Sequence, residues 1–438
     1  MKKLIVIIFI LSTIMILGCN TTISGEKILA NKKWEEDINY MDENLKKKHP
    51  DLFRYISEKT WNENIQKLKS DLKNLSDLEI SLRIGQIISS IGDAHTSIDF
   101  LEILTPIGTE KFDYEEIVEF PIKFEYFSNE LRAIASDSQY KSILGYKLIS
   151  INNVCTDEII KKVSTLISYD NQQFAKELAM SQMQIYEYLK FLQTVDGTKA
   201  EYVFENDNKE KIKIDVNAMK NKEVNYVNLD KIQSKISTKV EGKYDFYWTK
   251  QMKEDNVLYF KYNKCLTNQG ANINKQDAAN YPDYYDFHNN LLEEINNNDY
   301  DKLVIDLRQN RGGAFKLVDL LIHDLKYKIN LNSEDIVVIT GKETSSAGAI
   351  LAWRLQNELG ATIIGEETGG NVNMFGTEGE FIILPNSKIK VKHPYSFREL
   401  KEGYNGGVKP DIDITQTYKN YINGIDDCYE YVVNILDK

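Results

Sequence analysis

Residues 335–370 read DIVVITGKETSSAGAILAWRLQNELGATIIGEETGG, and this stretch decides the fold. The apolar run Ile336–Ile339 predicts a buried strand, and a polar turn separates it from the small residues Ala347–Ala349, which begin a predicted helix. A hydroxyl on that turn would lie beside the free N–H groups of the helix N-terminus, which favour developing negative charge. The stretch therefore predicts either a nucleophile for acyl transfer or a Ser/Thr helix cap without chemistry.

A second polar turn follows the strand predicted at Lys302–Leu307 and ends in Gly312 and Gly313. Paired glycines let backbone N–H groups approach a substrate without an intervening Cβ. Most glycine-rich turns only change the direction of the chain. This turn also lacks the Walker pattern, which argues against phosphate binding.

The region before residue 100 predicts a helical domain, assigned to residues 19–100. Capping boxes are predicted to begin helices at Thr60 and at Ser76, and the second helix should end at Gly92. His95 follows immediately, at a helix-to-strand corner from which a side chain can project into a cleft. Taken alone, a single histidine is more often a structural hydrogen-bonding residue.

Residues 115–217 predict a separate block with strands and helices. Within it, the segment Ile143–Val154 resembles the Gly-x-x-Ile-x-x-Ile-Asn-Gly core of PDZ domains. The long helical segment predicted from Gln172 to Leu192 departs from a standard PDZ domain. The block is therefore interpreted as PDZ-like.

The N-terminus predicts a leader. Lys2 and Lys3 precede an apolar run from Leu4 to Leu17, which suits a signal-peptide core better than a membrane span of about 20 residues. The following Cys19 completes a sequence that resembles the lipobox of bacterial lipoproteins. That resemblance implies that residues 1–18 are removed and that Cys19 carries lipid.

The composition argues against several classes of partner and cofactor. The net charge is −12, which argues against a nucleic-acid partner. The 4 cysteines show no Cys-x-x-Cys spacing, so neither a zinc site nor a disulfide framework is expected. Cys155, Cys265 and Cys428 are expected to be small buried hydrophobes. No metal and no cofactor is predicted.

Four motifs in the C-terminal half occur together in one order. They are DLRQNRGG at Asp306–Gly313, TSSAG at Thr344–Gly348, GEETGG at Gly365–Gly370 and GVKPDI at Gly407–Ile412. In this combination the chain resembles the carboxyl-terminal-processing, or tail-specific, serine protease family. The resemblance implies an α/β fold with a crotonase/Clp protease-like β-β-α core, which we assign to residues 225–438.

The resemblance also implies roles for residues in the two turns. The serine before Ala347 would be the nucleophile, which makes it Ser346 rather than Ser345. The oxyanion hole would use the Ala347 N–H and one N–H from Gly312 or Gly313.

The residue expected to act as general base depends on one position at which this sequence differs from many members of the family. Many members place a lysine after Thr-x-Gly, but Asn371 stands at that position here, and an amide cannot take the serine proton. The chain is more similar to the branch of tricorn and interphotoreceptor retinoid-binding protein. Catalytic members of that branch use a histidine from a Gly-Asp-x-His-Thr stretch, which corresponds to His95, and a glutamate before Gly-Val-x-Pro-Asp. Glu402 is the first candidate for that glutamate and Glu399 the second.

The sequence therefore predicts an extracytoplasmic serine peptidase, anchored to the membrane through Cys19 and acting on peptides or proteins. A non-catalytic ligand- or peptide-binding protein on the same fold is the main alternative. A third hypothesis is an esterase that uses the same nucleophile.

Overall fold

The computed structural model describes residues 27–109, 113–236, 244–269, 280–329, 332–376 and 381–436. The predicted leader and Cys19 lie outside these residues. Among the helices described, none is long and apolar enough to cross a bilayer.

A six-stranded sheet forms the base of the C-terminal half. Its order is β10-β11-β12-β13-β14-β19, with β10 antiparallel to β11 and all other neighbours parallel. The strands are Tyr247–Met252 (β10), Val257–Tyr262 (β11), Lys302–Asp306 (β12), Ile336–Thr340 (β13), Thr362–Gly365 (β14) and Ile412–Asp413 (β19). Every residue of β13 is buried, as expected where helices cover both faces of a parallel sheet.

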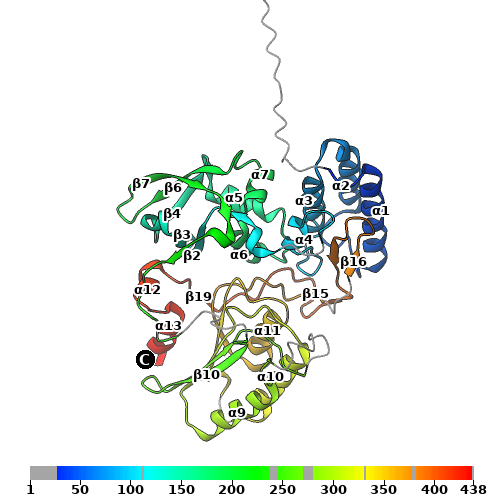
Figure 1. Cartoon of the computed structure of the whole chain (residues 1–438). Helices are drawn as coiled ribbons and strands as arrows, with labels where there is room; N and C mark the ends of the chain where they lie inside the picture. Colours follow the sequence, from blue (N-terminus) through cyan, green and yellow to red (C-terminus); the bar gives the residue numbers. More distant parts are fainter. Residues whose placement is uncertain are drawn as a thin grey trace, which may run out of the picture.

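Helices cover this sheet from both sides (Figure 1). One face, which includes Leu303 and Ile305, packs against α9, α10 and α11, whereas Val304 on the other face packs with α13. This alternation follows from the two-residue period of a strand. The helices are Tyr284–Asn297 (α9), Phe315–Tyr327 (α10), Ala347–Leu359 (α11), Tyr418–Ile422 (α12) and Asp427–Leu436 (α13).

The register of the sheet brings the two predicted turns together. Strands β12 and β13 are parallel neighbours, with Asp306 opposite Ile339. The loops that leave their carboxyl ends therefore emerge at the same edge of the sheet. In open α/β sheets this edge is where ligands bind.

The N-terminal region is helical, as predicted. Helix α3 begins with the predicted capping box, in which Ser76 and Glu79 bond each other's backbone. Helix α2 differs from the prediction, because its N-cap is Ser57, whose hydroxyl accepts the Thr60 N–H at 3.0 Å. The helices are Asn31–Lys48 (α1), Glu58–Asp71 (α2), Asp77–Ser89 (α3) and Phe100–Leu104 (α4).

A hairpin from the C-terminal half completes this helical region. Its strands are Phe381–Ile383 (β16) and Lys390–Lys392 (β17), and buried residues of the hairpin share one apolar cluster with α1, α2 and α3. The cluster is thus assembled from segments far apart in the sequence. Ser97, two residues after His95, forms a backbone bridge with Lys392 of the same hairpin.

The middle of the chain forms a second sheet with its own apolar cluster. Its strands are Ile122–Phe127 (β2), Glu130–Asp137 (β3), Lys147–Ile151 (β4), Val154–Cys155 (β5), Lys199–Glu205 (β6), Lys211–Asn217 (β7) and Tyr226–Asn228 (β9). Its helices are Thr156–Ser164 (α5), Gln172–Gln182 (α6) and Tyr186–Phe191 (α7). We call this unit the inserted block. The PDZ-like interpretation of the block stays a prediction.

Three details of the inserted block differ from the sequence reading. The single helical segment expected over residues 172–192 is two helices, α6 and α7. Strand β9 lies beyond residue 217 and pairs with β3. Cys155 is exposed, whereas Cys265 and Cys428 are buried as expected.

Short two-stranded pairings complete the fold. They join Val118–Glu119 (β1) to Met219–Lys220 (β8), and Met374–Gly376 (β15) to Ser396–Arg398 (β18).

Candidate active site

The turn before α11 holds Ser346 in a backbone conformation that side chains rarely adopt. Its φ is 50° and its ψ is −130°, immediately before α11 begins at Ala347. Strain of this kind in a non-glycine residue clusters at functional sites. The Ser346 side chain makes no capping hydrogen bond to α11, which removes the helix-cap reading for this hydroxyl.

Hydrogen bonds from the neighbouring loop fix this turn. The Thr344 hydroxyl donates to the Leu307 carbonyl at 2.8 Å, and the Ser345 N–H donates to the Asn310 carbonyl at 2.9 Å. Gly348 is required for this contact, because a Cβ there would lie 2.4 Å from the Asn310 carbonyl oxygen. Ser345 itself is buried, whereas Ser346 is half-buried and accessible.

The two turns meet at Gly312. A Cβ at this position would lie 2.7 Å from both the Ala347 nitrogen and the Ser346 Cβ, so only glycine fits beside the nucleophile. The Gly312 N–H is already occupied, because it donates to the Asn310 Oδ1 at 2.8 Å. In the described residues, no hydrogen bond uses the N–H of Gly313 or Ala347. These two groups are the candidate oxyanion donors.

His95 reaches Ser346 from the helical region. Its Nε2 lies 3.3 Å from the Ser346 Oγ, across a separation of 251 residues. The His95 side chain is 12 % exposed, so it is largely shielded from water while one edge remains accessible. A nucleophile and a base within hydrogen-bond reach are the geometry required for base-activated attack.

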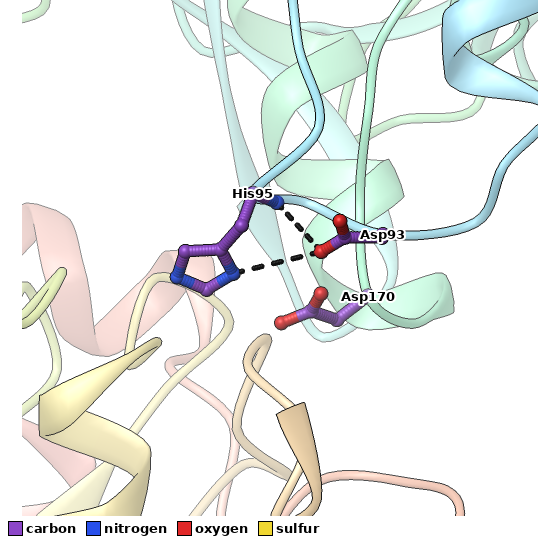
Figure 2. A group of neighbouring side chains, drawn as sticks. All are labelled: Asp93, His95 and Asp170. Atoms are coloured by element: carbon purple, nitrogen blue, oxygen red, sulfur yellow. Dashed lines mark hydrogen bonds and ion pairs between the residues drawn. The ribbon is translucent and has the colours of Figure 1, made fainter. Parts of the chain in front are cut away.

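Two carboxylates lie beside the His95 ring (Figure 2). Oxygen atoms of Asp93 and Asp170 and a ring nitrogen of His95 lie within 4.8 Å of one another. The Asp93 Oδ1 is 3.7 Å from the His95 Nδ1, which is longer than a hydrogen bond. Asp93 also accepts the backbone N–H of His95 at 2.8 Å, and this bond orients the loop.

Asp93 is held as a charged acceptor by its surroundings. Burial alone would favour its neutral form, but hydrogen bonds from His49, His95 and Thr96 bring the pKa of the Asp93 carboxyl well below its usual range. The Nδ1 of His49 accepts the Asp51 N–H at 3.2 Å, so its Nε2 carries the proton that faces Asp93 at 3.4 Å. Asp93 is therefore a fixed negative charge behind His95.

The pKa of His95 responds to these charges. Burial disfavours the imidazolium, but Asp93 and Asp170 outweigh burial and raise the pKa of His95 above its ordinary value, with Lys392 opposing them. Among the described residues, Asp93, His95 and Asp170 are the group of three close enough to hold a metal ion together. Since the Nε2 of His95 faces Ser346, the same arrangement suits proton transfer.

Comparison with known proteins finds one family profile that matches part of the chain. Residues 322–414 match the profile of Peptidase family S41. This part of the chain is therefore similar to peptidase family S41. The match supports the serine-type peptidase of the C-terminal-processing group that the four motifs predicted. No curated protein sequence matches at a significant level.

Two solved structures share the fold of this chain. The structure of mature CPAF complexed with lactacystin aligns with a TM-score of 0.64 at 11% identity, covering 93% of this chain and 98% of that chain. The crystal structure of mature CPAF aligns with a TM-score of 0.61 at 11% identity, and the alignment covers 93% of this chain and 96% of that chain. The likeness to CPAF extends over nearly the whole chain and supports the predicted α/β class.

The structure does not bring Glu402 to His95. The backbone N–H groups of Leu400 and Lys401 donate to the Asn373 Oδ1 at 2.8 and 3.0 Å, and this turn leaves Glu402 exposed. No hydrogen bond or ion pair joins Glu402 to His95 in the described part of the chain. The carboxylates beside the base are instead Asp93, which lies inside the quoted histidine motif, and Asp170, for which the sequence offered only its place before a predicted helix.

Asn371 occupies the position of the family's lysine and has a structural role. Its side-chain amide donates to the Asp170 carbonyl and to the Asn405 Oδ1, both at 3.1 Å. It also accepts from the Asn171 side chain at 3.1 Å. This position therefore joins the loop after β14 to the inserted block.

Proposed function

We propose that this protein hydrolyses peptide bonds with Ser346 as nucleophile and His95 as general base. The observation that supports it is the 3.3 Å approach of the His95 Nε2 to an uncapped, strained Ser346. A binding protein without catalysis has no need of this pair. The serine–histidine arrangement also favours the histidine-using branch of the family over the serine–lysine branch.

The proposed reaction follows the geometry. The Ser346 Oγ attacks the scissile carbonyl carbon while its proton moves to the His95 Nε2. The carbonyl oxygen becomes an oxyanion, which the N–H groups of Ala347 and Gly313 stabilise. The imidazolium then returns its proton to the leaving amine, and water attacks the acyl-enzyme with His95 again acting as base. Asp93 orients the ring through the His95 backbone.

A cavity beside the two turns is the proposed place for the peptide. It has a volume of about 640 Å³ and lies between the inserted block and the six-stranded sheet. Arg311, Gly341 and Glu177 are among its lining residues. Burial, together with the charges of Glu125 and Glu343, raises the pKa of Glu177 to about 8. A neutral carboxylic acid at physiological pH can donate a hydrogen bond to a peptide carbonyl.

Labelling with a fluorophosphonate tests the nucleophile. Such a probe reacts only with an activated serine, so the wild-type protein should be labelled and Ser346→Ala should not. Ser345→Ala is the matched control, because it alters the neighbouring buried hydroxyl and should retain most of the labelling. Circular dichroism would verify that both variants fold. Undiminished labelling of Ser346→Ala would overturn the assignment.

We further propose that the peptidase is extracytoplasmic and lipid-anchored through Cys19. The support is the apolar leader that ends at the lipobox-like sequence before Cys19. Each buried CH₂ adds about 0.8 kcal/mol, so two or more acyl chains would hold the protein firmly at a membrane. Cys19→Ala should move the protein from the membrane fraction to the soluble fraction. Equal membrane retention of this variant would rule out anchoring through Cys19.

A further inference from the structure

Asp170 brings a carboxylate from the inserted block into the acid–base pair. It lies in the loop between α5 and α6, immediately before the Asn171 N-cap of α6. Its Oδ1 accepts the N–H of Ala94, the residue before His95, at 2.9 Å. Its Oδ2 faces the N–H of Asn371 at 3.4 Å. One side chain thus bonds both the loop of His95 and the loop that follows β14.

The neighbouring contacts hold this carboxylate in place. The Asn171 side-chain amide donates to the Thr368 carbonyl at 3.0 Å, while its Oδ1 accepts from the first turn of α6. Gly369 permits the approach of α6, because a Cβ there would lie 3.0 Å from the Phe174 Cβ and 2.0 Å from the Lys342 carbonyl oxygen. The start of α6 is therefore docked directly on the loop behind the nucleophile.

We propose that Asp170 is a positioning residue for His95, supplied by the inserted block. This inference rests on the proposed function. When the Ser346 proton moves to the His95 Nε2, the ring becomes an imidazolium whose other nitrogen faces Asp93 and Asp170 (Figure 2). Asp170 stabilises that cation electrostatically and fixes the His95 loop through the Ala94 N–H.

Asp170 is suited to this role because the carboxylate of Asp93 already accepts hydrogen bonds from other groups. Asp93 accepts bonds from His49, from the Thr96 hydroxyl and from the His95 backbone, whereas the ring Nδ1 has no hydrogen-bond partner in the described structure. The negative charge of Asp93 is shared among these donors. Asp170 therefore supplies a second negative charge close to the His95 ring. An opposite charge within about 4–6 Å favours the charged form of a titrating group.

The pH dependence of catalysis separates this role from a structural one. The charged groups facing His95 are Asp93, Asp170 and Lys392. Asp170→Asn removes one negative charge, so the pKa of His95 should fall and the rising limb of kcat/KM should move to lower pH by on the order of one unit. Above that limb, kcat/KM should fall by about tenfold, because one pKa unit corresponds to a tenfold change.

Asn171→Ala is the matched control. It removes the amide contact to Thr368 and the cap of α6 but leaves the Asp170 charge. Its kcat/KM falls through looser docking, while the limb should stay at the wild-type pH. If Asp170→Asn does not fold, Asp170→Ser removes the same charge and retains an acceptor for the Ala94 N–H.

The outcomes are distinguishable. An unshifted limb in a folded Asp170 variant, or an equal shift in Asn171→Ala, would overturn the positioning role. Loss of wild-type activity in EDTA, restored by a divalent cation, would also overturn it, since the cluster would then hold a metal. If Ser346→Ala kept its activity, the proposed function itself would fail, whatever the Asp170 variants did.

Discussion

The loops that carry Gly312 and Ser346 leave neighbouring strands of one sheet, whereas His95 comes from a helical region 251 residues before the nucleophile. Backbone pairing between β12 and β13 sets the distance between the first two. The position of His95 depends instead on side-chain contacts, in which Asp170 and Asn371 join three separate segments. The loops of Gly312 and Ser346, which we call the sheet half, are fixed by strand pairing. The surroundings of His95, the proposed base, are assembled by packing, and we call them the base half.

This difference has a consequence for how the enzyme can be altered. Changes in the sheet half act on the reacting atoms directly, because Gly312 touches Ser346 and the Ala347 nitrogen. Changes in the base half act through the docking of the inserted block and the helical region. Variants in the sheet half should therefore lower kcat/KM without moving its pH dependence. Variants that change the charges around His95 in the base half should also move the pH at which kcat/KM rises.

The largest effect is expected from removing the base. His95→Ala should lower kcat/KM on a peptide substrate by about 10²–10⁴-fold, the range for loss of a general base. In the wild type, the base must be neutral, so kcat/KM should rise with pH through an apparent pKa above the ordinary value of about 6.5, because Asp93 and Asp170 raise the pKa of His95. Wild-type kinetics in His95→Ala, or a limb well below 6.5, would contradict this assignment.

The sheet half is tested by filling the space beside the nucleophile. Gly312→Ala should reduce kcat/KM by about 10²–10³-fold, the range for losing an oxyanion donor, because its Cβ would displace the Ala347 N–H. The pH limb should remain at its wild-type position, since His95 is untouched. Gly197→Ala is the control, because a Cβ there meets nothing within 4 Å. A fully active Gly312→Ala would refute this placement of the oxyanion hole.

A buried ionic network holds Arg308 in the loop that leads to Gly312. Its loss should lower the free energy of unfolding more than it lowers kcat/KM. Arg308 pairs with Asp306 at 2.8 Å and with Asp426 at 2.7 Å, and all three side chains are at most 15% exposed. Asp426→Asn should lower the free energy of unfolding by about 3–5 kcal/mol, as for one partner of a buried pair. Urea denaturation measures this change. Glu63→Gln, which alters an exposed pair, should change it by less than about 0.5 kcal/mol.

The smallest effect is expected at Glu402. Its side chain is exposed and lies outside the charges that act on His95, so Glu402→Gln should change kcat/KM by less than about twofold. Steady-state kinetics on the same peptide would measure it. A loss comparable to that of His95→Ala would restore Glu402 as the third member of the triad.

Local pattern was sufficient wherever a residue's role is set by its neighbours in the chain. The apolar run Ile336–Ile339 could only become a buried strand, and the turn after it placed Ser346 before a helix. The capping box at Ser76 was equally local. These features depend on hydrogen bonds and burial within a few residues, which a sequence displays directly.

The interpretation of Glu402 shows where such reasoning stops. Proximity in sequence to the motif at Gly407 suggested it, but the turn around Asn373 leaves its side chain at the surface. Asp170 occupies a place beside the base without any comparable sequence signal. Its neighbours Ala94 and Asn371 are 76 and 201 residues away.

The sequence by itself determined the resemblance to the family, the α/β class and the two turns that meet at Ser346, because each is encoded in contiguous residues and in their order. Only the tertiary structure decided which carboxylates face His95 and which glycine N–H remains free. Those answers depend on how the inserted block and the helical region pack against the sheet. Packing is the sum of many weak long-range contacts, and no short stretch of the chain records it.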